Sequence, residues 1–466
     1  MHDVKSKVAE EFIDNGEILE TMEYARANRH NRALIESILD KAEEAKGITH
    51  REAAVLLECD LEDLNERMFT LAKKLKEKIY GNRIVMFAPL YLSNYCINGC
   101  TYCPYHAKNK TMLRKRLTQK EIEAEVIALQ DMGHKRLALE AGEHPLNSIE
   151  YILESIKTIY GIKHKNGAIR RVNVNIAATT VENYRKLADA GIGTYILFQE
   201  TYNKENYKKL HPYGPKSDYA YHTEAMDRAM EGGIDDVGIG VLFGLTNYLY
   251  DFVGLIMHAE HLEAAHGVGP HTISVPRICP ADDIDVADFE NALPDEIFHK
   301  IVAVIRISVP YTGMIISTRE TQASREKVLE LGVSQISGGS NTSVGGYDEA
   351  DRTEEDTAQF DVSDHRTLDQ VISWLIDLGY VPSFCTACYR LGRTGDRFMS
   401  LVKTGQIANC CAPNALMTLK EYLVDYASPE TRRKGEETIK REMAKVPNET
   451  VRTKSNETLE SQDTRE

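Results

Sequence analysis

The sequence predicts an α/β fold, a TIM-type (βα)8 barrel of eight parallel strands that are each followed by a helix. Eight short apolar runs recur between Arg83 and Ser340, and amphipathic segments with helical spacing separate them. Repeated strand–helix alternation is typical of a parallel sheet, which closes most economically into a barrel. An open doubly wound sheet is the alternative, because periodicity alone does not show closure.

The predicted strands are short runs rich in β-branched and other apolar residues. Between them, amphipathic helices are expected at Gln119–Met132, Ser148–Tyr160, Val181–Ala190 and Tyr219–Glu231. The strands in chain order are RIVMFAPL (83–90), RLALEAG (136–142), RVNVNIA (171–177), TYILFQE (194–200), DVGIGVLFG (236–244), HTISVPRI (271–278), GMIISTRE (313–320) and SQISGGS (334–340).

Further segments are expected on both sides of the barrel, which takes residues 81–347. Residues 1–80 form an N-terminal helical extension, because apolar residues recur there at helical spacing. An acidic linker, 348–364, leads to a mainly helical C-terminal unit, 365–440, which carries the second group of cysteines and is expected to bind a cluster. The tail, 441–466, is polar and aperiodic, and we expect it to fray.

The composition is that of an ordinary globular protein. Of the 466 residues, 42% are hydrophobic and 27% are charged. We expect a cytoplasmic protein, because the chain has no run of about 18 apolar residues and no apolar secretory signal. A formal charge of −15 argues against a nucleic-acid partner.

Six of the nine cysteines fall into two tight groups, which indicates metal binding rather than disulfides. The first group is Cys96, Cys100 and Cys103, directly after the first predicted strand. Three thiolates on one short loop can hold three corners of a cubane iron–sulfur cluster and leave its fourth iron open. Zinc is the alternative, with His106 as the fourth ligand that a closed zinc site needs.

This C-x3-C-x2-C spacing after the first strand of a (βα)8 barrel resembles the radical S-adenosylmethionine (SAM) superfamily. The resemblance implies a 4Fe–4S cluster on Cys96, Cys100 and Cys103, with SAM bound to the fourth iron. Reduction of that cluster then cleaves SAM to a 5′-deoxyadenosyl radical. The same resemblance sets Tyr102, the aromatic residue before the third cysteine, against the adenine; otherwise its ring packs the loop.

A second matching element ends the second strand, in the run Glu140–Glu143. It is similar to the G-G-E element of the superfamily, with Ala141 in place of the first glycine. It implies that Gly142 and Glu143 contact the ammonium group of SAM. Barrel enzymes build their sites at this end of the strands, which strengthens the match. Glu200, at the end of the fourth strand, is a further candidate for contact with SAM or its ribose.

Later strand ends resemble a narrower group, the radical SAM lyases of aromatic amino acids. The runs Gln199–Asn203 and Ser317–Glu320 are similar to segments of the tyrosine lyases. A guanidinium at a strand end can bind the substrate carboxylate through two hydrogen bonds, so Arg319 is the candidate, with Ser317 beside it and Arg325 as the alternative. The resemblance implies cleavage of tyrosine into p-cresol and dehydroglycine.

The second group of cysteines is Cys385 and Cys388, followed after 22 residues by Cys411. A C-x2-C pair alone fits zinc, a redox dithiol or a cluster. Three thiolates leave one metal position open, which favours an iron–sulfur centre with an exchangeable ligand; Cys410 can replace Cys411 as the third. The cysteines expected to be small buried hydrophobic residues are Cys59, Cys279 and Cys410.

This C-x2-C-x22-C tail resembles the tyrosine lyases that mature FeFe-hydrogenase. The resemblance implies a second 4Fe–4S cluster with a labile iron, where CO and CN⁻ from dehydroglycine form an Fe(CO)2(CN) unit with free cysteine as a ligand. His271, which opens the sixth strand, is predicted to bind that iron, with His261 and His266 as competitors. The implied partners are tyrosine and SAM, a reductant such as ferredoxin or flavodoxin, and other hydrogenase maturation proteins.

Two other functions stay open. A 2-iminoacetate synthase of thiamine thiazole synthesis would release dehydroglycine and form neither CO nor cyanide. A non-enzymatic iron–sulfur carrier or scaffold would bind clusters without cleaving SAM. Measurement of 5′-deoxyadenosine and of tyrosine-derived products distinguishes the three.

Overall fold

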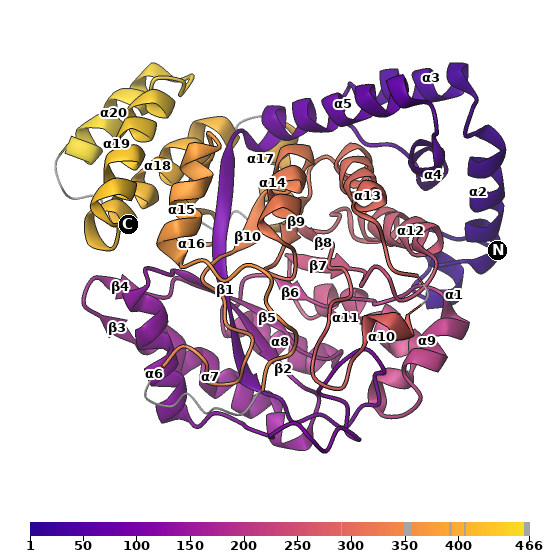
Figure 1. Ribbon diagram of the computed structural model, residues 1–466, viewed down its shortest axis with the longest axis horizontal. Helices are drawn as coiled ribbons and strands as arrows, with labels where there is room; N and C mark the ends of the chain where they lie inside the picture. The colour runs from indigo at the N-terminus through magenta and orange to yellow at the C-terminus, as the bar shows by residue number, and fades with distance from the viewer. Residues whose placement is uncertain (290, 349–356, 391–393, 405–406, 461–466) are drawn as a thin grey trace.

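The protein is a closed barrel of eight parallel strands, as the sequence predicts (Figure 1). The computed structural model describes the chain apart from residues 290, 349–356, 391–393, 405–406 and 461–466. Pairing of β10 with β1 closes the ring. The barrel strands are β1 (Arg83–Ser93), β2 (Arg136–Ala141), β5 (Arg171–Asn175), β6 (Tyr195–Ile196), β7 (Val237–Gly240), β8 (Thr272–Ser274), β9 (Gly313–Ile316) and β10 (Gln335–Ser337).

Helices cover the outside of the barrel, so its later strands are buried along their whole length. Side-chain caps fix where these helices begin: Thr118 and Glu121 form a reciprocal capping box at the start of α6. A short hairpin of β3 (Lys163–His164) and β4 (Gly167–Ala168) follows α7. The covering helices are α6 (Gln119–Asp131), α7 (Ile149–Gly161), α8 (Val181–Asp189), α9 (Lys204–Leu210), α10 (Tyr219–Thr223), α11 (Ala225–Glu231), α12 (Tyr248–His266), α13 (Asp295–Ser308) and α14 (Gln322–Leu331).

One predicted helix, Tyr219–Glu231, is two helices in the structure. Glu224 separates α10 from α11, with φ −83° and ψ 7°. Its carboxylate accepts a hydrogen bond of 3.0 Å from the backbone amide of Ala9. The break therefore coincides with a contact to the N-terminal segment, which local sequence periodicity does not reveal.

The N-terminal extension is helical, as predicted, and packs on α12 and α13. Its helices are joined by polar contacts as well as by apolar packing. The His50 imidazole lies between Glu17 and Glu260, at 2.8 Å and 2.7 Å, and so links α2, α4 and α12. The helices are α1 (Ala9–Phe12), α2 (Asn15–Asn28), α3 (Arg32–Ala42), α4 (His50–Glu58) and α5 (Glu62–Tyr80).

The C-terminal unit joins the barrel through a strand that periodicity did not predict, β11 (Val381–Ser383). It pairs in parallel with the first three residues of β1, Arg83–Val85. Because β11 is an edge strand, Pro382 loses no ladder hydrogen bond on its open side. The helices of this unit are α15 (Leu368–Asp377), α16 (Ala387–Arg390), α17 (Gly395–Lys403), α18 (Ile407–Asp425), α19 (Pro429–Met443) and α20 (Glu449–Glu460).

The tail was expected to fray, and the structure corrects this. Residues Glu449–Glu460 form α20, which packs on α18. Asn448 caps its first turn by accepting a hydrogen bond of 3.1 Å from the amide of Val451. Tertiary packing here compensates for the weak helical pattern. Residues 349–356 of the predicted acidic linker lie outside the described residues.

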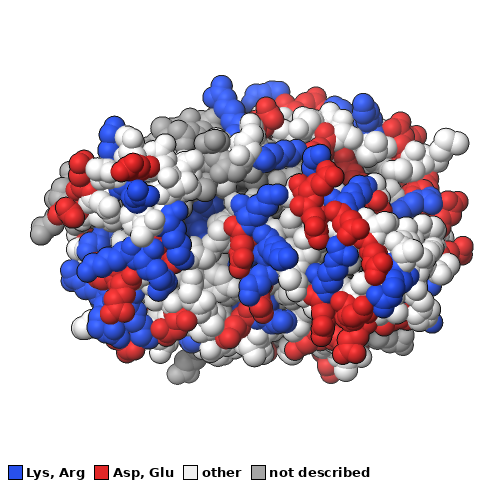
Figure 2. Space-filling view, turned by 90° about the horizontal axis from the view of Figure 1, so that it is seen from above, with Lys and Arg blue, Asp and Glu red and all other residues white. Residues whose placement is uncertain are grey.

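The surface carries both charges. On the face in Figure 2, basic and acidic side chains are interspersed over the helices. Within the described part of the chain, every helix is too short or too polar to span a bilayer.

A buried group of charges fastens the C-terminal unit to the barrel. Glu421 of α18 accepts two hydrogen bonds from Arg170, of 2.9 Å and 2.7 Å, and lies 3.1 Å from the ammonium of Lys135. The Glu421 and Lys135 side chains are 1% and 2% exposed, so each depends on the other for charge compensation.

Glu421→Ala should therefore loosen this unit. Lys135 would keep a buried charge without its carboxylate, and we expect a loss of about 3–5 kcal/mol in unfolding free energy, measured by denaturant titration. Glu437→Ala is the control, because Glu437 pairs with Arg433 on the surface, where a pair contributes less than about 1 kcal/mol. Equal losses in the two variants would contradict the assignment.

Candidate functional site

The loop that carries the first cysteine group leaves β1 and is held against the end of β2. The amide of Ile97 donates to the carbonyl of Glu143 at 2.8 Å, and the amide of Gly142 donates to the carbonyl of Ser93 at 3.0 Å. A side chain at Gly142 would collide with the carbonyl of Tyr95, so the close approach of the two segments requires glycine. The two sequence motifs are therefore adjacent in space.

Cys96, Cys100 and Cys103 line one cavity at this end of the barrel. Burial raises the pKa of Cys100 to about 11 and that of Cys103 to about 12. These thiols bind metal as thiolates, so metal binding must displace their protons. Three soft donors on one wall of one cavity fit three corners of a 4Fe–4S cluster. His106, the alternative zinc ligand, instead lies 3.1 Å from Asp283.

The predicted carboxylates line the same cavity. Asn98, within the cysteine loop, donates a hydrogen bond of 2.7 Å to Glu143, while burial raises the pKa of that carboxyl. Glu200 adopts a left-handed backbone, φ 67°, that is uncommon for a residue with a side chain. The strained backbone turns Glu200 to Lys216, whose ammonium donates a hydrogen bond of 2.8 Å.

Lys216 is one of the cations that line this cavity, with Arg319. Burial alone would lower the pKa of Lys216. The interactions with Glu200 and Cys100 outweigh burial, so the pKa of Lys216 is raised and the ammonium remains charged. It lies 5.7 Å from the ring centre of Tyr102, whose hydroxyl contacts the imidazole of His211 at 2.7 Å. The Tyr102 ring is thus fixed as a wall of the cavity.

Arg319 lies further along the barrel interior. Its guanidinium stacks on Phe360 at 3.7 Å, and Nη1 donates to the sulfur of Cys279 at 3.3 Å. Ser317 lines the adjoining cavity with it. Arg325, the alternative, is fully buried and bonded to Asp364 and the carbonyl of Ser337. Arg325 therefore belongs to the packing of the fold.

The second cysteine group lies at the opposite end of the barrel. Cys385, Cys388 and Cys411 line one cavity with His271, which directly precedes β8. Burial lowers the pKa of His271, although Asp236 at 3.4 Å opposes this; the neutral imidazole is the form that binds metal. Three thiols and an imidazole are a donor set suited to iron.

Two arginines also line this second cavity, Arg83 and Arg136. The pKa of Cys411 is lowered, first by a hydrogen bond from Cys388. The contacts with Cys410 and the Arg83 cation lower it further. The thiolate form of Cys411 is accordingly favoured. Cys410 lies 3.8 Å from Cys411, but its thiol donates to the carbonyl of Ile407.

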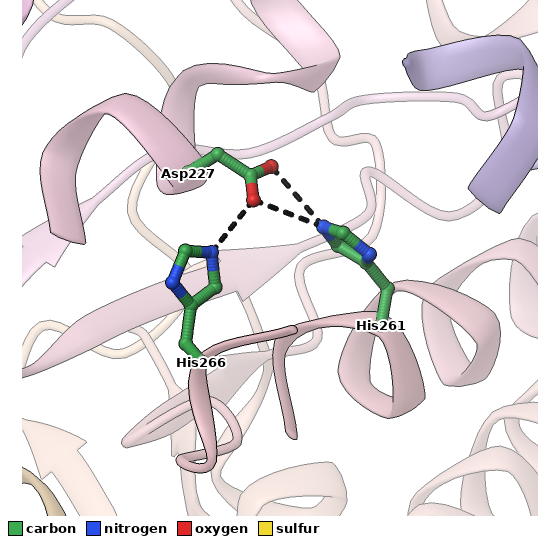
Figure 3. A group of neighbouring side chains, drawn as sticks. All are labelled: Asp227, His261 and His266. Atoms are coloured by element: carbon green, nitrogen blue, oxygen red, sulfur yellow. Dashed lines mark hydrogen bonds and ion pairs between the residues drawn. The ribbon is translucent and has the colours of Figure 1, made fainter. Parts of the chain in front are cut away.

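His261 and His266 lie elsewhere and contact Asp227 (Figure 3). They are the two histidines that the sequence offered as competitors of His271.

Three cavities follow one another through the barrel interior. The first, with Cys96, Cys100 and Cys103, shares Glu140 and Arg319 with the middle one. The middle cavity shares Gln335 with the cavity of the second cysteine group. The shared residues place the three cavities next to one another, with the two cysteine groups in the outer two.

Sequence reasoning missed several residues of these cavities and misassigned one. Cys279 and Cys410 were expected to be small buried hydrophobic residues, but both are half-buried, and Cys279 lines the first cavity. Cys59 is buried as expected. Asn98 lies at a variable position of the cysteine motif, which does not specify its role, and Lys216 belongs to no motif and reaches the site only in the folded chain. Arg83 and Arg136 each begin a strand, at the end of the barrel that faces the C-terminal unit. This position could have identified them as candidate residues of the second cavity.

Comparisons with known proteins agree with this arrangement. Family models match at residues 90–256, the radical SAM superfamily, and at 274–381, the Biotin and Thiamin Synthesis associated domain. A crystal structure of HydG, a maturase of the [FeFe]-hydrogenase, is 54% identical, with a TM-score of 0.94 over 98% of both chains. The chain belongs to the HydG family.

Two further relatives are more distant. HydG from Carboxydothermus hydrogenoformans is 40% identical, with a TM-score of 0.82 over 97% of this chain and 99% of that one. The 2-iminoacetate synthase of Escherichia coli is 28% identical over 77% of this chain and 93% of its own. As a HydG family member the protein is a radical SAM enzyme of hydrogenase maturation, a class that uses a 4Fe–4S cluster, SAM and a reductant.

Glu140, between the first two cavities, should control the pH dependence of turnover. Burial raises its pKa to about 8, against the opposing effects of Arg319 and a hydrogen bond with Asn175. The carboxyl is therefore mainly neutral at pH 7 and becomes an anion beside Arg319 as the pH rises through about 8. We expect 5′-deoxyadenosine formation to fall over that range, and Glu140→Gln, which stays neutral, to remove this fall.

The control for this pH profile is Glu125→Gln. Glu125 is a buried carboxylate outside the cavities that accepts hydrogen bonds from the amides of Tyr347 and Asp348. Its replacement should leave the profile unchanged. An unaltered fall in the Glu140→Gln enzyme would exclude Glu140 as the titrating group.

Proposed function

We propose that the protein is a tyrosine lyase that supplies the Fe(CO)2(CN) precursor for FeFe-hydrogenase. It cleaves tyrosine into p-cresol and dehydroglycine at one end of the barrel and converts dehydroglycine into CO and CN⁻ at the other. The observation that carries this proposal is the pair of three-cysteine groups at opposite ends of a series of adjoining cavities.

The first cavity has residues for SAM and for an amino acid. When bound, the cluster on Cys96, Cys100 and Cys103 and its SAM supply a 5′-deoxyadenosyl radical. Glu143, oriented by Asn98, is suited to receive the ammonium of SAM, next to the small surface of Gly142. Glu200, fixed by Lys216, is suited to the ribose, and the Tyr102 ring to the adenine.

Arg319 is the proposed partner of the tyrosine carboxylate. It lies on the wall between the first two cavities, where a bound amino acid would face the radical source. Stacking on Phe360 fixes the plane of its guanidinium, and a planar fork matches a carboxylate with two hydrogen bonds. Ser317, on the middle cavity, can add a hydroxyl to the same group.

Dehydroglycine is proposed to travel through the barrel interior. The middle cavity lies between the two ends, and passage through it would limit hydrolysis of the imine by bulk water. The name of the E. coli relative agrees with the first half of the reaction, because 2-iminoacetate is the same compound as dehydroglycine. Release of that compound without further conversion is the second candidate function.

The second cavity is proposed to complete the reaction. Cys385, Cys388 and Cys411 would hold the second 4Fe–4S cluster, and His271 would bind a labile iron that also carries free cysteine. Arg83 favours the thiolate that cluster binding requires. The proposed partners are a reductant such as ferredoxin or flavodoxin and the maturation proteins that receive the product.

Arg319→Lys tests the substrate site. Lysine keeps the charge and loses the fork, so tyrosine affinity should fall about 10- to 100-fold, the value of one charged hydrogen bond. Equilibrium dialysis with labelled tyrosine measures this, and SAM binding should be unchanged as an internal control. Arg319→Gln should weaken tyrosine binding further. Equal tyrosine affinity in all three proteins would remove Arg319 from the site.

Cys388→Ala tests the division of labour between the two ends. The variant should still form 5′-deoxyadenosine and p-cresol, because Cys388 lies at the end of the barrel opposite the SAM cavity, but CO formation should be lost. Cys410→Ala is the matched control: its thiol faces the Ile407 carbonyl, and CO formation should persist. Full CO yield from Cys388→Ala, or loss of p-cresol with it, would contradict the two-site proposal.

A further inference from the structure

A second cluster of potential ligands lies outside the barrel cavities, between α11 and α12 (Figure 3). His266 Nε2 lies 2.7 Å from Asp227 Oδ1, and His261 Nε2 lies 3.1 Å from the same oxygen and 3.2 Å from Oδ2. Both imidazoles thus converge on one carboxylate, and the potential donor atoms all lie within 4.8 Å of one another.

The hydrogen-bond pattern of His261 shows that a cation is needed here. Its Nδ1 lies 2.8 Å from the carbonyl oxygen of Val4, which can only accept, so Nδ1 carries the hydrogen. In a neutral imidazole, Nε2 then has a lone pair that faces the Asp227 carboxylate. Two lone pairs at 3.1 Å repel each other unless a proton or a metal ion lies between them.

A divalent metal ion and a proton on His261 can each meet this need. Without a metal ion, His261 would need an extra proton on Nε2. His266 would need one only if its own hydrogen were on Nδ1, because a neutral His266 with hydrogen on Nε2 can donate to the carboxylate. A divalent ion satisfies all three groups at once, and a histidine ligand commonly donates its other N–H to a carbonyl, as His261 does to Val4.

The geometry also suits a small transition-metal ion. Ligand atoms on tetrahedral zinc lie about 3.3 Å apart, given bonds of about 2.0–2.1 Å. The two imidazoles lie 2.7–3.2 Å from the Asp227 carboxylate, so an ion between them requires an expansion of these His–Asp separations. Asp227 and His261 are buried, whereas the His266 side chain is 15% exposed, which leaves a path for the ion and a position for a water ligand.

We propose that Asp227, His261 and His266 bind one divalent transition-metal ion, of which zinc fits best, separate from both cysteine groups. None of the cavities described above includes these residues, and the contacts of His261 with the N-terminal segment favour a structural role. The ion fastens the N-terminal segment to the barrel: Val4 accepts from His261, and the Phe12 ring stacks on the same imidazole at 3.8 Å.

The test uses the full chain, reconstituted anaerobically with its iron and sulfide. The protein is dialysed against one equivalent of zinc chloride, and bound zinc is counted by mass spectrometry. X-ray absorption at the zinc edge should show nitrogen and oxygen neighbours at about 2.0–2.1 Å, whereas zinc in a cysteine site shows sulfur at about 2.3 Å. Zinc should also slow tryptic cleavage at Lys5 and Lys7, next to Val4.

Two variants should lose this zinc. Asp227→Asn keeps the shape of the side chain, and His266→Ala changes a partly exposed residue at the end of α12, so both are expected to fold, as circular dichroism would verify. Zinc affinity should fall by at least about 100-fold in each, because loss of even an outer partner costs about 10- to 100-fold. The tryptic protection should disappear with it.

His30→Ala is the matched control, since His30 pairs with Asp60 at 2.6 Å on the surface and should not affect zinc. Binding in the wild type through nitrogen and oxygen, lost in both variants and kept in the control, supports the proposal. Absence of zinc binding, sulfur neighbours alone, or equal affinity in the Asp227 and His266 variants would overturn it.

Discussion

The rest of the structure depends on strand β1, because its length and its pairing with neighbouring strands constrain the positions of the other parts. Eleven residues, Arg83–Ser93, span about 35 Å at the rise of an extended strand. Its last residues pair with β2 and deliver the first cysteine loop to one end of the barrel. Its first residues pair with β11, and Cys385 follows two residues after that strand ends. One strand thus sets the positions of both cysteine groups.

Much of the fold and part of the site follow from local sequence patterns. Eight short apolar runs predicted the eight barrel strands. Three cysteines, with Gly142 and Glu143, predicted a site at one end of the barrel, because these motifs lie within a few residues of strand ends. The closure of the sheet and the strand β11 required long-range pairing, which periodicity does not encode. Lys216 reaches the first cavity through a segment whose path only the tertiary structure defines.

The interior of the barrel combines buried charge with fixed geometry. Glu200 keeps a strained backbone and holds Lys216, while Arg319 is fixed against Phe360. Each of these charged groups has a partner that restricts its movement, which is the usual condition for charge inside a protein. Such preorganisation suits a site that must hold a reactive intermediate still, since little reorganisation is then needed when the substrate binds.

The attachment of β11 to β1 has a consequence for how this architecture can change over time. β11 pairs with Arg83–Val85, before the segment of β1 that pairs with β2, while β10 closes the ring on the other side. The ring of eight strands is therefore complete without β11. The C-terminal unit therefore extends the sheet at one end of β1 without forming part of the ring, so changes in its length or sequence need not alter the closure of the barrel.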